Sequence, residues 1–425
     1  MSKKSVLIIT SSGGGGHLFA AAARAHEIHT NEPETNVIQR DVLLDWLGKH
    51  IGGLFAGFWN FAQKKGNVYL QKFLIFFQSS MEVTCWPLMF IGAFLAIYKH
   101  DIDEIIDTQP MDTSAILKAM RLYMKLKKKQ ITYEKVVVDL PTNKAVHYFR
   151  NIRNLSSKDR VHIKLLTTHP LLETHESEAH FWQCHTKLNE DQIIYAEFPL
   201  RATFKKIDSP LCNKTPLVIA PRIPSDAIWE CIEPSLKKGD IEYDYCKPYL
   251  DIVIPANARV CPIMLGSRPA HKATQGYVEQ FIKFKQTHQD DVHDIVFVFC
   301  RSHSQSKRNL LRMVCKSIEE ADFPKHLSII PLTFQDDAVI APLLARSNAS
   351  ITRSGGITSM ELLSHMEGKI WIHSETPYQS DLTTEALLNG IPAWEKGNAK
   401  YLRANKGAGI IVPELLIDEL TALVH

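Results

Sequence analysis

Apolar and polar positions separate clearly in the first thirty residues of the chain. Residues 6–9 form an uninterrupted apolar, β-branched run, which is typical of a strand buried in a parallel sheet. Four glycines at 13–16 follow this run, and the alanine-rich segment 18–28 then predicts a helix. A strand, a glycine-rich turn and a helix in this order place the backbone N–H groups of the helix N-terminus at the turn, beside His17. Such a loop either faces an anion such as a phosphate or only reverses the chain.

The alternation of strand and helix continues along most of the chain. Further strands are predicted at 102–107, 135–139, 161–167, 192–195, 261–265, 294–300, 327–331 and 349–352. Further helices are predicted at 114–128, 276–286, 306–319 and 359–366. This βαβ order predicts an α/β protein with two Rossmann-like, doubly wound parallel sheets, whose ligands bind at the carboxyl ends of the strands. The stretch 207–258 interrupts the order, so we divide the chain into 1–206, 207–258 and 259–425.

The segment 51–98 is unusually rich in Phe, Trp and Leu. Its part 83–98 carries no charge and is broken by Pro87, and it is short for a helix that crosses a bilayer. Two interpretations remain open: a helix buried in a large core, or a surface that dips into a membrane. In the second, the residues facing lipid and headgroups include Trp86, Phe90, Phe94, Lys64, Lys65 and Lys72. The basic run 125–129 is either a helix C-terminus or a further contact with an anionic membrane surface.

The overall composition limits which binding partners and which cellular compartment are expected. The 49 basic and 46 acidic residues give a net charge of +3, which argues against general binding of nucleic acid. The eight cysteines have no metal-ligand spacing, so we expect reduced thiols in a cytoplasmic protein and no metal site. The N-terminal residues have no pattern of a cleavable secretory signal.

A second glycine-bearing loop follows the predicted strand 349–352. It reads Arg-Ser-Gly-Gly-Ile-Thr at 353–358 and opens a helix. Neither glycine loop has the G-x-G-x-x-G spacing of a dinucleotide fingerprint or the Lys-Ser/Thr of a P-loop. The one Asp-x-Asp that could hold a metal, at 101–103, precedes a strand instead of following it, which disfavours a metal-dependent GT-A transferase.

Six segments, in order, resemble the branch of GT-B glycosyltransferases that holds monogalactosyldiacylglycerol synthases, processive diacylglycerol glucosyltransferases and the lipid II N-acetylglucosaminyltransferase. They are SSGGGGH at 11–17, DTQPMDTSAI at 107–116, VVVDLPT at 136–142, YAEFPLRATF at 195–204, ITRSGGITSMELL at 351–363 and WEKGNAKYLRANKGAGI at 394–410. The resemblance implies a GT-B fold with an acceptor-binding domain at 1–206 and a donor-binding domain at 259–425. Trp394 stands where the family often has a Gln that contacts the sugar, so the identity of the sugar cannot be inferred from the family.

The resemblance also implies the chemistry. An inverting, metal-independent enzyme moves a sugar from a UDP-sugar to a membrane lipid such as diacylglycerol, without a cofactor, as a cytoplasmic peripheral membrane protein. The base that takes the proton of the acceptor hydroxyl is expected to be His17 or Asp139, because a His of the glycine-rich loop and an Asp of the first half are both candidates for this role in the family. Each has a simpler alternative: His17 as a phosphate contact or cap neighbour, Asp139 as a cap on the following turn.

The implied donor site draws on both glycine loops. Gly355 and Gly356 hold the diphosphate, Glu361 grips the ribose hydroxyls, and Phe334 lies beside the nucleobase or packs in the core. The remaining donor contacts implied by the resemblance are Gly15, Gly16, Gly266, Ser267, Arg268, Ser354, Ile357, Thr358, Glu395, Gly397 and Asn398. Two other functions stay open: a transferase of the same fold with a soluble or protein acceptor, and a catalytically idle module that binds a nucleotide sugar or lipid. The sequence specifies neither the sugar nor the oligomeric state.

Overall fold

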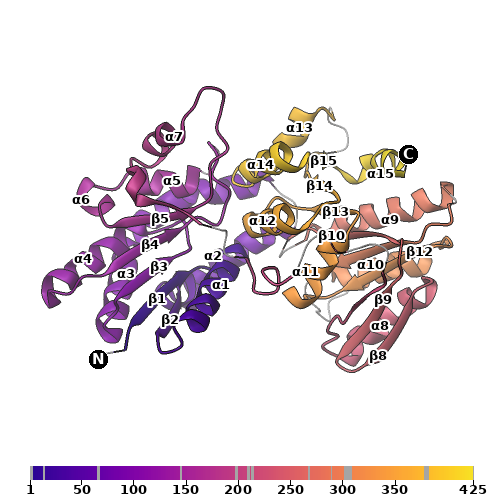
Figure 1. Cartoon of the computed structure of the whole chain (residues 1–425), viewed down its shortest axis with the longest axis horizontal. Helices are drawn as coiled ribbons and strands as arrows, with labels where there is room; N and C mark the ends of the chain where they lie inside the picture. The colour runs from indigo at the N-terminus through magenta and orange to yellow at the C-terminus, as the bar shows by residue number, and fades with distance from the viewer. Residues whose placement is uncertain are drawn as a thin grey trace.

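Two parallel six-stranded sheets form the framework of the computed structural model, one in each half of the chain (Figure 1). The structure describes residues 3–12, 15–64, 68–143, 146–196, 200–207, 211, 215–266, 269–288, 290–300, 309–377 and 382–424. The predicted contacts Ser267 and Arg268, like Lys65, lie outside these ranges, and the side chains of Lys64 and Lys72 are not described.

The N-terminal sheet has the strand order β2-β1-β3-β4-β5-β6. Its strands are β1 (Ser5–Thr10), β2 (Asn36–Asp41), β3 (Glu104–Asp107), β4 (Thr132–Val136), β5 (Ile163–Thr167) and β6 (Ile193–Tyr195). The helices of this half are α1 (Gly15–Asn31), α2 (Gly48–Lys64), α3 (Val68–His100), α4 (Thr113–Lys127), α5 (Val146–Arg153), α6 (Ser157–Arg160) and α7 (Glu178–His185). Strand β1 is buried along its whole length, as its apolar run predicts.

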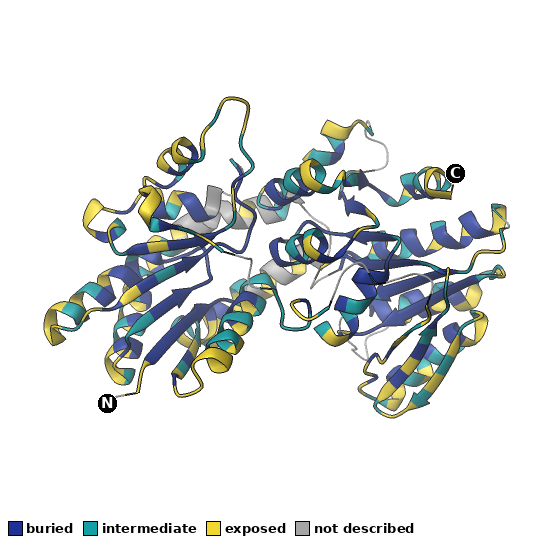
Figure 2. Ribbon diagram, viewed as in Figure 1, coloured by how far each residue is buried: buried dark blue, intermediate teal, exposed yellow. Residues whose placement is uncertain are grey.

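The C-terminal sheet repeats the design with the order β12-β11-β10-β13-β14-β15. Its strands are β10 (Arg259–Met264), β11 (Asp294–Phe299), β12 (Leu327–Leu332), β13 (Ala349–Thr352), β14 (Lys369–His373) and β15 (Gly409–Ile411). Its helices are α9 (His271–Thr287), α10 (Leu310–Glu320), α11 (Asp337–Arg346), α12 (Gly356–His365), α13 (Thr384–Asn389), α14 (Lys396–Lys406) and α15 (Leu416–Val424). Figure 2 shows the strands of both sheets largely buried, with the exposed residues gathered on the outer helices and loops. The α/β class with two parallel sheets is confirmed.

The stretch 207–258 contains a small antiparallel sheet. Strands β7 (Leu217–Ile219), β9 (Tyr249–Ile254) and β8 (Glu242–Cys246) form it in that order, and α8 (Asp226–Lys238) packs beside it. Buried side chains of β7, β9 and α8 belong to the same core cluster as those of β10 and β11. The segment is therefore attached to the C-terminal half by shared apolar burial, which its mixed composition did not reveal.

Strand β4 departs from its prediction. It begins and ends three residues before the expected 135–139, so Asp139 lies in the loop after the strand instead of at its last position. The predicted strand begins at Lys135 and leaves out Thr132, Tyr133 and Glu134. In the structure Glu134 is half-buried and pairs with Arg24 at 2.8 Å, and the buried Lys135 pairs with Asp107 at 2.7 Å, so both charges are accommodated in the strand.

Candidate functional site

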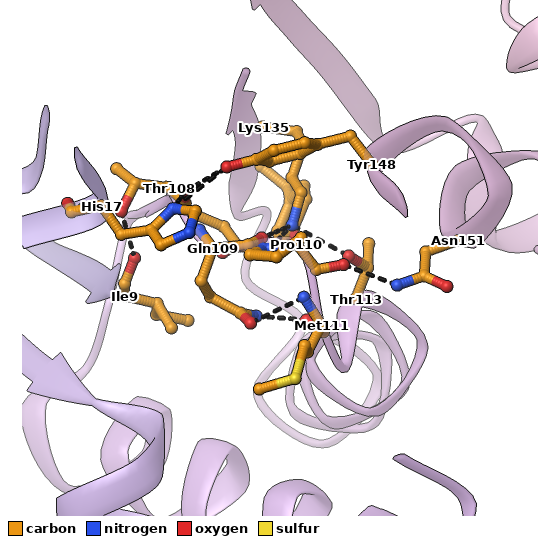
Figure 3. Close-up of polar contacts among 12 residues, drawn as sticks. Ile9, His17, Thr108, Gln109, Pro110, Met111, Thr113, Lys135, Tyr148 and Asn151 are labelled. Carbon is orange, nitrogen blue, oxygen red and sulfur yellow. Dashed lines mark hydrogen bonds and ion pairs between the residues drawn. The ribbon is translucent and has the colours of Figure 1, made fainter. Parts of the chain in front are cut away.

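His17 lies in the first turn of α1, at the carboxyl edge of the N-terminal sheet. Its Nδ1 is 2.9 Å from the carbonyl oxygen of Thr108 and 3.0 Å from the hydroxyl of Tyr148, which comes from α5 (Figure 3). A carbonyl oxygen only accepts hydrogen bonds, so Nδ1 carries the proton and donates it. In the neutral ring, Nε2 is then the nitrogen that takes up a proton. The surroundings thus fix the tautomer that a general base needs.

A buried ion pair supports the loop that holds His17. Lys135 and Asp107 are both fully buried, and the Lys135 ammonium donates to the Asp107 carboxylate at 2.7 Å, to the Thr113 hydroxyl at 3.0 Å and to the carbonyl of Gln109. All three protons of the ammonium group are therefore used. The Tyr133 hydroxyl also donates to Asp107. Because Gln109 directly follows Thr108, this pair anchors the carbonyl that orients His17.

Asp112, at the end of the same loop, is a polar residue that the sequence did not single out. It is only 6% exposed, its φ of 58° is left-handed, and its Oδ1 has no hydrogen-bond partner among the described residues. Burial, with the nearby charges of Glu82 and Asp107, raises its pKa to about 7, against the lowering effect of Lys135. Its side chain does not cap α4. The short, polar side chain and the left-handed backbone could have marked it as a turn position, but not as a buried acid.

Asp139 and Asn398 link the two halves. The Asn398 amide donates to Asp139 Oδ1 at 2.9 Å and to the carbonyl of Ser354 at 2.8 Å. Its own oxygen accepts from the backbone N–H of Leu140 at 2.7 Å. Asn398 is fully buried, and Asp139 is 8% exposed. One asparagine therefore connects the loop after β4, the second glycine loop and α14.

The N-terminus of α12 packs directly against the loop after β4. A Cβ built on Gly356 would lie 1.7 Å from the carbonyl oxygen of Val138 and 2.9 Å from Asp139 Oδ1. A Cβ on Gly397 would lie 2.2 Å from the Thr142 hydroxyl. Only glycine fits at either position. The positive end of the α12 dipole thus faces the Asp139 carboxylate, a place where helices bind anions.

Glu361, one turn into α12, is engaged by Arg201, from the segment 200–207 whose Leu200, Phe204 and Ile207 pack in the core of the C-terminal half. Arg201 donates from Nε to Oε1 at 2.6 Å and from Nη2 to Oε2 at 2.9 Å. Glu361 is 2% exposed, and this burial raises its pKa, while Arg201 opposes the rise. The same guanidinium lies 5.3 Å from the centre of the Phe19 ring, and Phe19 stacks on Phe334 with ring centres 6.3 Å apart. Phe334 is 55% exposed, which excludes the alternative of simple core packing for it.

Arg353 places a positive charge beside the second glycine loop. It is 5% exposed, and its Nη2 lies 3.3 Å from Glu395 Oε1. Burial raises the pKa of Glu395, and Arg353 counters the rise. Gly266, with φ +74°, lies against the Arg353 side chain, since a Cβ there would be 3.7 Å from Arg353 Cδ. The arginine was visible in the motif, but nothing in the sequence distinguished it from an exposed loop residue.

Of the other predicted donor contacts, Ile357 packs between the halves and the rest lie along their facing edges. Ile357 is 4% exposed and joins the core cluster of the N-terminal half, with a Cβ on Gly16 falling 3.8 Å from its side chain. Ile357 therefore packs between the halves. Ser354 is buried, Gly15, Gly355 and Thr358 are partly exposed, and Gly397 is buried against the N-terminal half. These residues all lie on α1, α12 or α14 or beside them, along the facing edges of the halves (Figure 1).

The predicted membrane residues lie elsewhere, on α3. Trp86, Phe90, Phe94 and Tyr98 stack in sequence with ring centres 5.2, 6.4 and 6.0 Å apart. The first three are half-buried and pack on the N-terminal core. The face that is exposed is the neighbouring one: Val83, Leu88, Ile91, Leu95 and Tyr98. Helix α3 is therefore part core and part exposed apolar surface.

Two lysines lie over rings of the aromatic row of α3. The ammonium of Lys118 lies 5.2 Å from the Trp86 ring centre, and that of Lys127 lies 4.8 Å from the Tyr98 ring centre. Among the described residues, the segment Glu82–His100 is the one helix long and apolar enough to cross a membrane by length and composition, and 28% of it is buried. In the described ranges, no group of three or more His, Cys, Asp or Glu side chains is arranged to hold a metal ion.

Comparison with known proteins gives likeness at the level of fold. No protein-family model matches the chain, and no curated protein sequence matches it. Among solved structures, a UDP-glucose: anthocyanidin 3-O-glucosyltransferase in complex with UDP is similar with a TM-score of 0.50 and 13% identity, over 100% of this chain and 90% of that one. The chain thus has the GT-B fold that the resemblance implied, as in this UDP-sugar glycosyltransferase.

Two weaker similarities have TM-scores below 0.5. The MurG structure from Acinetobacter baumannii has a TM-score of 0.47 and 14% identity, over 100% of this chain and 91% of its own. The UDP-GlcNAc 2-epimerase from Neisseria meningitidis, bound to UDP-GlcNAc, has a TM-score of 0.43 and 10% identity, over 99% and 100%.

Proposed function

We propose that the chain is an inverting glycosyltransferase that moves a sugar from a UDP-sugar to a hydroxyl of a membrane lipid such as diacylglycerol. One observation carries the proposal. The carboxyl edges of two parallel sheets face each other and bring an oriented histidine of one half beside the glycine-rich helix N-terminus of the other. The proposed base and the proposed site of the diphosphate therefore come from different halves.

His17 is the proposed general base. Thr108 and Tyr148 hold Nδ1 as a donor, so Nε2 accepts the proton of the acceptor hydroxyl as its oxygen attacks the anomeric carbon. Asp139 is the rival base. Its carboxylate is bound by Asn398 and faces the α12 N-terminus, which ties it to the donor side instead of to an incoming hydroxyl. This geometry favours His17.

The leaving diphosphate is proposed to bind at the N-terminus of α12. Backbone N–H groups at Gly355 and Gly356 and the helix dipole supply fixed positive potential there, and Arg353 adds a full charge. Such an array stabilises the charge that develops on the leaving group, so we propose a transfer step that does not use a metal ion. Glu395, Gly397 and Asn398 line the same edge and are proposed to contact the sugar or the phosphates.

Glu361 is proposed to bind the ribose, and Phe334 to flank the base. Each carboxylate oxygen has two lone pairs, and the bidentate Arg201 contact uses one of each, so Glu361 retains acceptor capacity for two hydroxyls. The exposed Phe334 ring, already stacked on Phe19, offers a flat apolar surface next to that position.

A lipid acceptor is supported by the exposed apolar face of α3 in the acceptor half. Five large apolar side chains are exposed on this helix, and Lys127, over the ring of the exposed Tyr98, would meet anionic headgroups there. We therefore propose a cytoplasmic, peripheral membrane enzyme.

UDP release tests the reaction. A panel of UDP-sugars is incubated with the full chain, with and without vesicles containing diacylglycerol and anionic phospholipid. We expect release with one sugar, stimulated by the vesicles and reduced at least about 100-fold in His17→Ala, which is the scale of a lost general base. His26→Ala, an exposed histidine on the same helix, is the matched control. If Asp139→Asn loses this much activity and His17→Ala keeps its activity, the base is Asp139 and not His17.

Vesicle flotation tests the membrane part. The double variant Ile91→Ser/Leu95→Ser should lose flotation with anionic vesicles, because both side chains are exposed on α3. Val218→Ser, an equally exposed apolar position on β7, should float as the unaltered chain does. If the double variant still floats, or if the unaltered chain does not float, the lipid acceptor is contradicted and a soluble or protein acceptor is favoured.

A second function is favoured by the contacts of the donor groups themselves. The candidate base Asp139 is held across the halves by Asn398, and the proposed ribose ligand Glu361 is held by Arg201. A chain that keeps these contacts permanently would be an idle module that binds nucleotide without turnover. UDP binding with no release from any sugar in the panel would establish this alternative.

A further inference from the structure

We propose that Glu375 is a sugar-binding residue of the donor site, whose carboxylate accepts hydrogen bonds from free hydroxyls of the transferred sugar, and that His373 positions it. The inference rests on the proposed function, because it takes the N-terminus of α12 as the site of the diphosphate. It concerns the loop after β14, which none of the six sequence motifs covers.

Glu375 lies at the carboxyl edge of the C-terminal sheet. β13 and β14 are neighbouring parallel strands, and Thr352 pairs with Ile372. Arg353 and His373 are the next residues along the two strands, so they lie side by side at this edge. Glu375 follows two residues later. The loop that bears Glu375 is therefore next to the loop that bears Arg353, the cation proposed to face the diphosphate.

The loop after β14 is fastened to α13 and the turn that follows it. The Ser374 hydroxyl donates to the carbonyl of Leu387 at 2.6 Å, and the backbone N–H of Glu375 donates to the carbonyl of Gly390 at 3.1 Å. A Cβ on Gly390 would lie 2.2 Å from the Ser374 hydroxyl and 2.1 Å from that of Thr376, so this close approach requires glycine. The backbone that carries Glu375 is thus fixed on both sides.

A buried histidine holds one oxygen of the Glu375 carboxylate. His373 is 4% exposed, and its Nε2 lies 3.4 Å from Glu375 Oε2. Its Nδ1 lies 2.9 Å from the hydroxyl of the buried Tyr277. A carboxylate only accepts hydrogen bonds, so the proton between the two side chains belongs to Nε2. Tyr277 and His373 therefore orient the carboxylate from the interior of the domain.

The second oxygen of Glu375 is left over. Oε1 is shielded from solvent and has no hydrogen-bond partner among the described residues, although one tenth of the side chain is still exposed. Burial acts to raise the pKa of Glu375, but His373 and Arg353 outweigh it and hold the pKa below its ordinary value, so the group is an anion at neutral pH. Because a buried acceptor without a donor is costly, a ligand that donates a hydrogen bond here gains binding free energy.

The charges around Glu375 select the ligand group. Glu395 lies 3.3 Å from the Arg353 guanidinium, and burial together with the charge of Glu375 raises the pKa of Glu395. Carboxylates repel a phosphate group but accept hydrogen bonds from hydroxyls. The sugar is joined to the diphosphate proposed to bind beside Arg353, so it brings hydroxyls to this place. The donor class that follows is a UDP-hexose with free ring hydroxyls.

Titration calorimetry separates the sugar from the nucleotide. The full chain and its variants are titrated with UDP, UDP-glucose, UDP-galactose and UDP-N-acetylglucosamine. Glu375→Ala should weaken binding of the tightest-bound UDP-sugar at least about tenfold and leave UDP binding within about twofold. His373→Phe, which removes the positioning donor, should weaken the same UDP-sugar less and leave UDP unchanged. Glu385→Ala, at an exposed glutamate on α13, should change neither affinity.

UDP binding in the same titrations reports whether each variant is folded. If Glu375→Ala loses UDP binding as well, the near-isosteric Glu375→Gln decides, and it should lose affinity for the UDP-sugar alone. UDP-sugar binding that is unchanged in both Glu375 variants, or loss of both ligands in both variants, would overturn the sugar-binding role while the proposed function stands. Absence of UDP binding by the unaltered chain would instead overturn the proposed function, and the role of Glu375 with it.

Discussion

The Lys135–Asp107 and Arg201–Glu361 ion pairs are both buried, but they connect different parts of the molecule. The first joins two neighbouring strands of one sheet, and every donor of its ammonium is used within that half. The second joins the segment 200–207, which packs in the core of the C-terminal half, to α12 of that half, and it engages a carboxylate proposed to bind the ligand. The first pair is thus a fixed support for the His17 loop, whereas the second lies at the proposed ligand site, with its guanidinium 5.3 Å from the ring centre of Phe19 on α1.

A third carboxylate sharpens the contrast. Asp112 is almost as buried as Glu361, but no cation among the described residues forms an ion pair with it, and its pKa rises to about 7. Asp107 and Glu361 are also buried, but each is paired with a cation that offsets the free-energy cost of burying the carboxylate. The comparison therefore predicts different responses when each of the three carboxylates, or its cation, is altered.

The largest effect is expected from Lys135→Met. The substitution leaves the Asp107 carboxylate buried without its cation, which should lower the free energy of unfolding by about 3–5 kcal/mol in a denaturant titration. Lys237→Met, which removes an exposed partner of Glu233, should cost less than about 1 kcal/mol. Equal, small losses in both variants would show that Lys135 is not a structural support.

A smaller effect is expected from Asp112→Asn, and it should depend on pH. The pKa of Asp112 is raised in the folded chain, so the folded state binds more protons than the unfolded state between about pH 4 and 7. Stability contributed by this group is therefore present at low pH and is lost as pH rises towards 7. Relative to Asp112→Asn, the unaltered chain should lose about 2 kcal/mol of unfolding free energy between pH 5 and pH 8. Parallel pH profiles of the two proteins would contradict the assignment.

Much of the fold could be predicted because its strands are apolar on both faces. Strands such as β1 and β11 are buried along nearly their whole length, so their apolar runs are visible without any other information. β4 was misplaced by three residues because it includes the charged Glu134, whose partner Arg24 lies far along the chain, and because it ends before the apolar residues 137 and 138. The small sheet of β7, β8 and β9 was missed because its strands alternate and are short.

The candidate site was predictable only where a local motif carried the signal. His17 and the second glycine loop stand beside strand-to-helix turns, and the structure brings both to the facing edges of the two halves. The partners of these residues were not predictable. Thr108 and Tyr148 meet His17 from 91 and 131 residues away, and Arg201 meets Glu361 from 160 residues away. Arg353 and Asp112 were missed because burial, which gives them their chemistry, arises only in the assembled fold.

The most direct test of a single site built from both halves is UDP binding, measured by titration calorimetry on the full chain. Glu361→Ala and the isosteric Glu361→Gln should weaken UDP binding at least about tenfold, because each removes the charged acceptor to which the ribose hydroxyls are proposed to donate. Glu367→Ala, an exposed glutamate two residues past the end of the same helix, should leave it unchanged. His17→Ala should bind UDP within about twofold of the unaltered chain while its turnover is lost. UDP binding that is insensitive to both Glu361 variants, or that is lost with His17, would contradict the division of base and donor site between the two halves.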